Sequence, residues 1–212
     1  EMARSFVDRL ASHGMDITLI PGNHDVYTFE SVRKRRFERY FGEYLPSEGL
    51  PTKKRLTGGT SLLLVPTVCP NLLSSRGRIT AETLERVKKL LESSPESVLC
   101  AAHYPLLTRT RTYYSRPSRR LRNAEALRQV LGTSGKRILF IAGHTHRQSY
   151  EADPDFPHLW HLTAPAFFAR DPHGAAQGAF NEIHAQTDGF RIRQKSCAAL
   201  QKTHRLSTGD PA

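Results

Sequence analysis

The sequence predicts an α/β fold in a single domain. Apolar, strand-like runs alternate with amphipathic helix patterns over most of the chain, and strand-like segments then follow one another without helices between them. A length of 212 residues suits one domain of ordinary size. We therefore expect a domain over residues 1–195, followed by a tail at residues 196–212.

The helix patterns have recognisable starts and ends. A helix over residues 2–12 is predicted by the apolar spacing i, i+3, i+4, i+7 and by a stop at Gly14. Thr80 is a typical N-cap for a helix to about residue 93, and Asn123 for one through residue 131. Residues 29–41 are compatible with a further, very basic helix.

The strand patterns fall into two groups. Short apolar runs predict buried strands at residues 17–20, 62–65, 98–102 and 138–142. Later segments predict antiparallel strands at residues 158–163, 166–169, 180–186 and 190–195. Thr-Asp-Gly-Phe at residues 187–190 predicts a hairpin turn, because Asp-Gly accepts the positive φ angles that this turn needs.

The composition excludes some classes of protein. No apolar run approaches the ~20 residues of a membrane helix, so we expect no membrane span. The three cysteines are far apart, with no CxxC spacing, which favours a reducing compartment, and we expect a cytoplasmic protein. The net charge of +11 predicts attraction to polyanions. Charge alone does not separate a phosphoester substrate from nucleic acid.

Polar, metal-capable side chains follow three of the predicted strands. These loops read Gly22-Asn23-His24-Asp25, His103-Tyr104-Pro105 and Gly143-His144-Thr145-His146. In open α/β sheets the ligand site lies outside the carboxyl ends of the strands, so the three loops are expected to meet. Each motif is weak alone, but three strand-end loops with such residues are hard to obtain from turn preferences.

The residue types in these loops suit divalent cations. Neutral imidazoles and an amide oxygen are ligands for Mn, Fe, Zn or Co. His144 and His146 can present imidazoles to adjacent metals if their loop is turned rather than extended. Asp25 follows His24 directly and is placed to hold its tautomer or stabilise its charged form.

The three motifs together resemble the calcineurin-like metallophosphoesterase superfamily, of the cyclic-nucleotide phosphodiesterase type. The resemblance spans roughly residues 1–195. It implies a sandwich of two mixed β-sheets flanked by helices and a phosphoester hydrolase site with two divalent metal ions. It also implies that Asn23, His103 and His144 bind one metal and that His146 binds the other.

The resemblance further implies the catalytic roles. His24 would contact the phosphate and protonate the leaving oxygen, and Asp25 would support it. Two cations about 3.5–4 Å apart activate a hydroxide and stabilise both the attacking and the leaving oxygens. The implied reaction is phosphoester hydrolysis, with a phosphodiester as the favoured substrate class.

The sequence departs from the family pattern in two ways. Many members carry a second His where this chain has Tyr104. The family also has an Asp-x-His motif and a Gly-Asp motif upstream of the Asn-His motif, and residues 1–21 contain neither. Since the chain starts inside a helix pattern, we expect that an N-terminal segment is lacking. Neutral ligands alone poorly offset two dications, so we expect one weakly held metal.

An Arg-rich segment follows His103-Tyr104-Pro105. Residues 109–128 contain seven Arg and one Glu. Arg109 and Arg111 are expected to bind phosphate oxygens, and Tyr113 to stack on a base. An alternative function stays open, in which a catalytically impaired remnant binds anionic ligands, nucleic acid or a protein partner through its basic surface.

Overall fold

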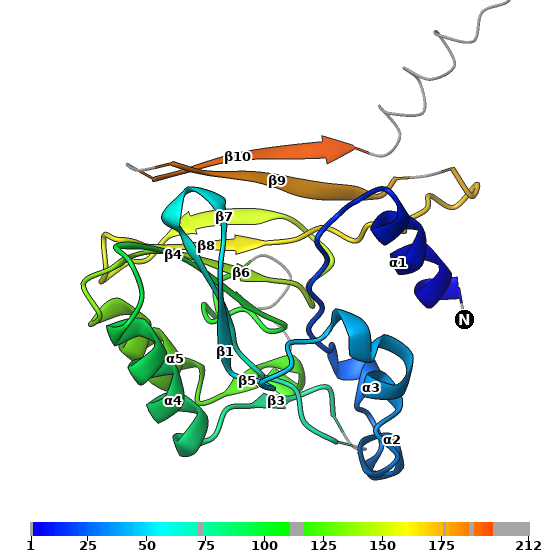
Figure 1. Cartoon of the computed structure of the whole chain (residues 1–212), viewed down its shortest axis with the longest axis horizontal. Coiled ribbons are helices and arrows are strands. Elements are labelled where there is room, and N and C mark those ends of the chain that lie inside the picture. Colours follow the sequence, from blue (N-terminus) through cyan, green and yellow to red (C-terminus); the bar gives the residue numbers. More distant parts are fainter. Residues whose placement is uncertain (1, 72–73, 111–116, 176, 187–188, 197–212) are drawn as a thin grey trace, which may run out of the picture.

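The computed structural model describes residues 2–71, 74–110, 117–175, 177–186 and 189–196 (Figure 1). Its centre is a six-stranded mixed sheet in the order β1-β2-β4-β6-β8-β7. The strands are β1 Thr52–Arg55, β2 Ser61–Leu64, β4 Ser97–Ala102, β6 Arg137–Ala142, β7 Ser149–Ala152 and β8 Leu159–Thr163. Strands β2, β4, β6 and β8 are parallel, and the two edge strands are antiparallel to their neighbours.

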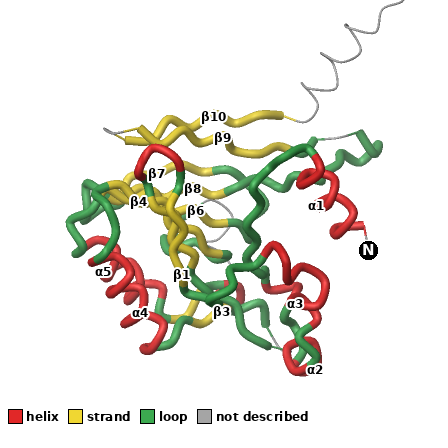
Figure 2. The backbone as a smooth tube through the Cα atoms, in the orientation of Figure 1, coloured by secondary structure: helices red, strands yellow, loops and turns green. Residues whose placement is uncertain are grey.

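Two helices cover one face of this sheet (Figure 2). They are α4 Ala81–Glu92 and α5 Ala124–Gly132. Their apolar stripes, which include Val87 and Leu127, pack on alternate residues of the sheet such as Val98, Cys100 and Phe140. These side chains are almost fully buried. Burial of this apolar surface is the main stabilising contribution to the domain.

A β-hairpin packs against the opposite face of the sheet (Figure 2). It consists of β9 Ala179–Gln186 and β10 Gly189–Ser196, paired antiparallel. Leu99, Leu139 and Leu162 of the larger sheet are buried beneath Ile183 and Ile192 of the hairpin. The α/β class and the stacking of two sheets are therefore confirmed. In the described ranges the second sheet has only these two strands.

The smaller elements complete the domain. Helix α1 Met2–Ser12 lies beside the start of β9 (Figure 1). The other elements are η1 Asn23–Asp25, α2 Phe29–Arg33, α3 Arg36–Phe41, η2 Gly42–Tyr44, η3 Thr57–Gly59, β3 Gly77–Arg78, η4 Pro117–Arg119 and β5 Leu121–Arg122. Strands β3 and β5 form a short parallel pair. None of the helices in the described ranges has the length and apolar character needed to cross a membrane.

The expected helix starts are partly right. Thr80 caps α4, since its hydroxyl accepts a hydrogen bond of 3.1 Å from the Thr83 N–H. Asn123 makes no side-chain cap for α5, because it takes a left-handed conformation and its amide donates to the Ile79 carbonyl. The helix expected over residues 29–41 is broken into α2 and α3 by Arg35, whose φ of 47° is left-handed.

Two expected strands are wrong. Residues 17–20 are not in a strand; the Leu19 N–H donates to the carbonyl of Tyr44 and not to a neighbouring strand. Residues 166–169 contain a turn, in which Phe167 and Phe168 contact the Phe6 ring of α1. Strands β1 and β7 were not predicted, because edge strands such as Thr-Lys-Lys-Arg and Ser-Tyr-Glu-Ala carry little apolar signal. Residues 187–188 of the expected hairpin turn lie outside the described ranges.

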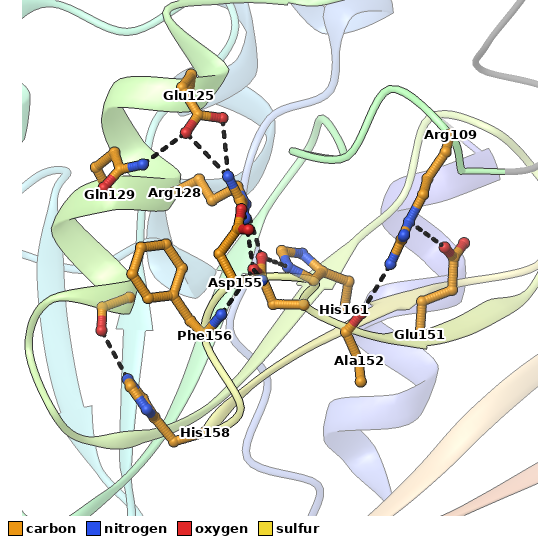
Figure 3. A network of polar contacts seen from close by, with 12 residues as sticks. Arg109, Glu125, Arg128, Gln129, Glu151, Ala152, Asp155, Phe156, His158 and His161 are labelled. Carbon is orange, nitrogen blue, oxygen red and sulfur yellow. Dashed lines mark hydrogen bonds and ion pairs between the residues drawn. The ribbon is translucent and has the colours of Figure 1, made fainter.

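A buried ion network ties α5 to the sheet (Figure 3). The guanidinium of Arg128 donates two hydrogen bonds, of 2.7 and 2.6 Å, to the carboxylate of Asp153. His161 Nε2, from β8, donates to the same carboxylate at 2.8 Å. Burial alone would raise the pKa of Asp153, but the hydrogen bonds from Arg128, backbone N–H groups and His161 outweigh it and lower this pKa.

We predict that Asp153→Ala destabilises the fold strongly. The change leaves the Arg128 charge buried without its main partner, which typically costs about 3–5 kcal/mol. The lowered pKa means that the wild-type contribution is present above the unfolded pKa of about 3.9 and is lost as the pH falls below it. Denaturant unfolding at neutral and acidic pH measures both effects.

The matched control is Asp155→Ala. It removes an exposed partner of the same guanidinium and should lower the free energy of unfolding by at most about 1 kcal/mol. Equal losses in the two variants would contradict the prediction.

Candidate functional site

Two of the three motif loops meet at the carboxyl edge of the central sheet. Strand β4 ends at Ala102 and β6 at Ala142, and these two residues are partners in the parallel register. His103 and Gly143 therefore leave the sheet side by side, and the Gly143 N–H donates to the His103 carbonyl at 3.1 Å. The sheet thus brings together segments separated by 40 residues of chain.

The third loop brings Asn23 to the same place. Asn23 begins η1 and is buried. Its Oδ1 accepts a hydrogen bond of 2.7 Å from His103 Nε2 and lies 3.3 Å from His144 Nδ1. His144 Nδ1 is in turn 3.2 Å from His103 Nε2. We call these three residues the Asn-His-His cluster.

The loop of His144 and His146 is turned, as its predicted function requires. Both histidines have left-handed φ angles, 64° for His144 and 57° for His146. The Thr145 N–H donates to the Gly143 carbonyl at 2.7 Å and closes the turn. The turn directs Nδ1 of His144 at the cluster, while His144 Nε2 donates to the backbone carbonyl of Arg119 at 3.0 Å.

The two imidazoles of the cluster are neutral at physiological pH. Burial, together with the nearby His144, His146 and His24, lowers the pKa of His103 to about 3. Burial likewise lowers the pKa of His144 to about 4. Neutral imidazole is the form that donates a lone pair to a metal. Neither imidazole therefore has to lose a net charge before the site binds a cation, but His103 has to move its ring hydrogen from Nε2 to Nδ1.

The spacing of the Asn-His-His cluster fits one divalent cation. Metal–nitrogen and metal–oxygen bonds of about 2.0–2.2 Å place neighbouring ligand atoms about 2.8–3.6 Å apart in octahedral or tetrahedral geometry. Two of the three separations, 3.2 and 3.3 Å, fall in this range, and the 2.7 Å hydrogen bond between His103 and Asn23 lengthens slightly when both atoms bind a cation. One amide oxygen and two imidazoles suit Mn, Fe, Co or Zn.

No carboxylate joins this cluster in the described residues. Over those ranges, no group of three His, Cys, Asp or Glu side chains comes together in a way that could hold a metal. The Asn-His-His cluster is a candidate metal site because Asn23, which is not one of these residue types, supplies the third donor atom. Without a carboxylate, the charge of a bound dication is not offset, which weakens its binding.

His146 and His24 lie near the cluster without joining it. Both side chains are exposed, and their charges contribute to lowering the pKa of His103 and of His144. The ring of His24 packs edge-on against Tyr27, with centroids 4.9 Å apart. The predicted second metal at His146 and the predicted acid role of His24 stay predictions.

Asp25 makes its hydrogen bond to the backbone. Its Oδ2 accepts from the Gly22 N–H at 2.8 Å and so closes the turn of η1. Partial burial raises the pKa of Asp25, while this bond and the charge of His24 act in the opposite direction. Its influence on His24 in this structure is therefore electrostatic, and the expected support of His24 by Asp25 stays a prediction.

Arg109, a predicted substrate-binding residue, makes its contacts with strand β7. Arg109 pairs with Glu151 of β7 at 3.1 Å and donates to the Ala152 carbonyl at 3.0 Å (Figure 3). These contacts occupy the guanidinium that was expected to bind phosphate. Arg111 and Tyr113 lie outside the described residues.

Two contributors to the site were not predicted. Tyr104 is fully buried; its hydroxyl donates to the Ser75 carbonyl at 2.7 Å, and its ring centroid lies 4.4 Å from that of His144. The backbone carbonyl of Arg119 holds the far side of the same imidazole. Carbonyls leave no mark in a sequence, and Tyr104 was noted only as a departure from the family pattern.

Comparisons with known proteins place the chain in a family. The model of the calcineurin-like phosphoesterase family matches residues 1–148. This match covers more than half of the chain, and the chain belongs to the calcineurin-like phosphoesterases. The matched range contains both the Asn-His loop and the His-x-His loop of the candidate site. No curated protein matches the chain.

Solved structures confirm the fold. A dimetal phosphatase from Danio rerio has a TM-score of 0.54 and 17% identity, over 68% of this chain and 57% of that one. A 5'-nucleotidase from Candida albicans has a TM-score of 0.50 and 13% identity, over 89% of this chain and 37% of that one. The chain therefore spans little more than half of the first protein and about a third of the second.

We predict that Gly22→Ala weakens metal binding. A Cβ at this position would lie 3.1 Å from Cε1 and 3.2 Å from Nδ1 of His103, which is closer than ordinary van der Waals contact, so the imidazole must shift from its place in the cluster. A change that disturbs a metal ligand, or a group that orients one, typically lowers the affinity for the metal about 10–100-fold. Calorimetric titration with Mn²⁺ measures the loss.

The matched control is Gly143→Ala in the same site. Its Cβ would lie 3.8 Å from His103, an ordinary van der Waals distance, so its Kd for Mn²⁺ should stay close to that of the wild type. If Gly22→Ala and Gly143→Ala bind Mn²⁺ equally well, the steric prediction is wrong.

Proposed function

We propose that this protein is a metal-dependent hydrolase of phosphoesters, with phosphodiesters as its substrate class. The observation that carries the proposal is the convergence of Asn23 Oδ1, His103 Nε2 and His144 Nδ1 within 2.7–3.3 Å of one another. Family membership supports metal-dependent phosphoester chemistry at these residues. The restriction to diesters rests on the motif pattern of the sequence.

Each side chain has a defined part in this proposal. Asn23, His103 and His144 hold one divalent cation, Mn, Fe, Zn or Co, and His146 belongs to a second. When bound, such cations polarise the phosphoryl group and lower the pKa of a water molecule. Tyr104 and Gly22 limit the positions open to the two partly buried imidazoles.

His24 is the proton donor in the proposed reaction. It is exposed at the mouth of the site, so a substrate can reach it, and its ring is supported edge-on by Tyr27. Protonation of the leaving oxygen by His24 avoids the release of an alkoxide. The neighbouring Asp25 carboxylate accepts from the Gly22 N–H and so holds the η1 turn that carries His24.

A catalytically impaired protein that binds anions is the second candidate function. The observation that favours it is the absence of a carboxylate from the cluster in the described residues. In that case the excess of 11 positive charges would serve to bind an anionic ligand, nucleic acid or a protein.

The free thiols of Cys69 and Cys100 suit a reducing compartment, and we propose that the protein is located in the cytoplasm.

We predict that the protein hydrolyses bis-p-nitrophenyl phosphate when Mn²⁺ is added, and that His24→Ala lowers kcat. Loss of a general acid typically costs about 10²–10⁴-fold. Release of p-nitrophenolate measures the rate. His184→Ala, which changes an exposed histidine on β9, is the control and should keep wild-type activity. A His24→Ala protein as active as this control would remove His24 from the mechanism.

We further predict that the chain retains at most one equivalent of metal, held weakly. The neutral cluster offers three donors and no carboxylate to offset a second dication. Elemental analysis after dialysis against metal-free buffer measures the retained Mn or Zn. Two tightly held equivalents per chain would show that the ligand set proposed here is incomplete.

A further inference from the structure

We infer that the backbone carbonyl of Arg119 selects the tautomer of His144 and thereby makes Nδ1 the nitrogen that binds the cation. This inference rests on the proposed metal site and concerns a contact outside the Asn-His-His cluster. Arg119 acts through its peptide group and is a positioning residue.

The hydrogen-bond partners of His144 assign its ring hydrogen. A carbonyl oxygen only accepts, and the Arg119 oxygen lies 3.0 Å from His144 Nε2. The hydrogen therefore sits on Nε2. The opposite tautomer would set the Nε2 lone pair against this oxygen and would lose the hydrogen bond.

The atoms on the other side of the ring agree with this assignment. His144 Nδ1 faces His103 Nε2 at 3.2 Å, and the same His103 nitrogen donates to Asn23 Oδ1 at 2.7 Å. One hydrogen on His103 Nε2 thus serves two acceptors, Asn23 Oδ1 and His144 Nδ1. These two acceptors are 3.3 Å apart, a separation that one bound cation can span.

The surrounding protein keeps the ring from turning over. The buried Tyr104 ring lies against His144 at a centroid distance of 4.4 Å. The carbonyl itself is presented by η4, which is closed by a hydrogen bond of 3.3 Å from the Arg120 N–H to the Pro117 carbonyl. The Arg-rich segment thus contributes to the site through its backbone. A hydrogen bond from a metal-binding histidine to a carbonyl orients the ring and raises its basicity.

The decisive variant is Arg120→Pro. Proline removes the N–H that closes η4 and disfavours the helical conformation of residue 119, so the Arg119 carbonyl turns away from His144. The matched control is Arg120→Ala, which loses the same side chain and keeps the turn. Far-UV circular dichroism and denaturant unfolding establish that both variants are folded.

Two measurements test the inference. Long-range ¹H–¹⁵N correlation spectra of the metal-free protein report which nitrogen of His144 carries the hydrogen. Calorimetric titration with Zn²⁺ reports the Kd. We expect Nε2–H in the wild type and in Arg120→Ala, a mixture of tautomers in Arg120→Pro, and a Kd raised about 10–100-fold in Arg120→Pro alone.

The outcomes separate this inference from the proposed function. A wild-type His144 with its hydrogen on Nδ1, or an Arg120→Pro protein with the Kd of Arg120→Ala, overturns the role of the Arg119 carbonyl even though metal binds. A wild type that binds no Zn²⁺ overturns the proposed function and the role of Nδ1 as a ligand, while the metal-free spectrum still decides whether the carbonyl sets the tautomer.

Discussion

The parallel register between β4 and β6 is the constraint on which the candidate site depends. Because Ala102 and Ala142 are partners, the chain leaves both strands at the same level, and the loops of His103 and His144 start side by side. The register is in turn enforced by burial on both faces, where Val98 and Ile138 face the helices and Leu99 and Leu139 face the hairpin. A slip of one residue would exchange these two sets.

The ion network and the Asn-His-His cluster are stabilised in different ways. The ion network places full charges in the interior and pairs them, with Arg128 held by Asp153. The Asn-His-His cluster instead keeps its imidazoles neutral through burial, so that their lone pairs stay available. The first arrangement fastens α5 to the sheet. In the proposed metal site, the second arrangement would offer lone pairs to a cation, and its neutral donors would limit how strongly that cation is held.

The inferred role of Arg119 gives the Arg-rich segment a function other than phosphate binding. Its charge first indicated phosphate binding, yet Arg109 is engaged with β7 and the Arg119 peptide contacts His144. A main-chain contact is independent of the charge of the side chain that carries it. Through this contact the segment would orient a histidine of the proposed metal site, whatever its other side chains bind.

Three of the four buried strands, the α4 cap at Thr80 and the family motifs could be predicted from the sequence, because apolar runs, capping residues and strand-end histidines are local features. The other features depend on contacts between segments that are distant in the chain. Residues 17–20 have strand-like side chains but no strand beside them, and polar edge strands such as β1 form because a neighbour offers hydrogen bonds. The Arg119 carbonyl likewise acquires its role from proximity alone, since every residue has a carbonyl and only the fold chooses which histidine it meets.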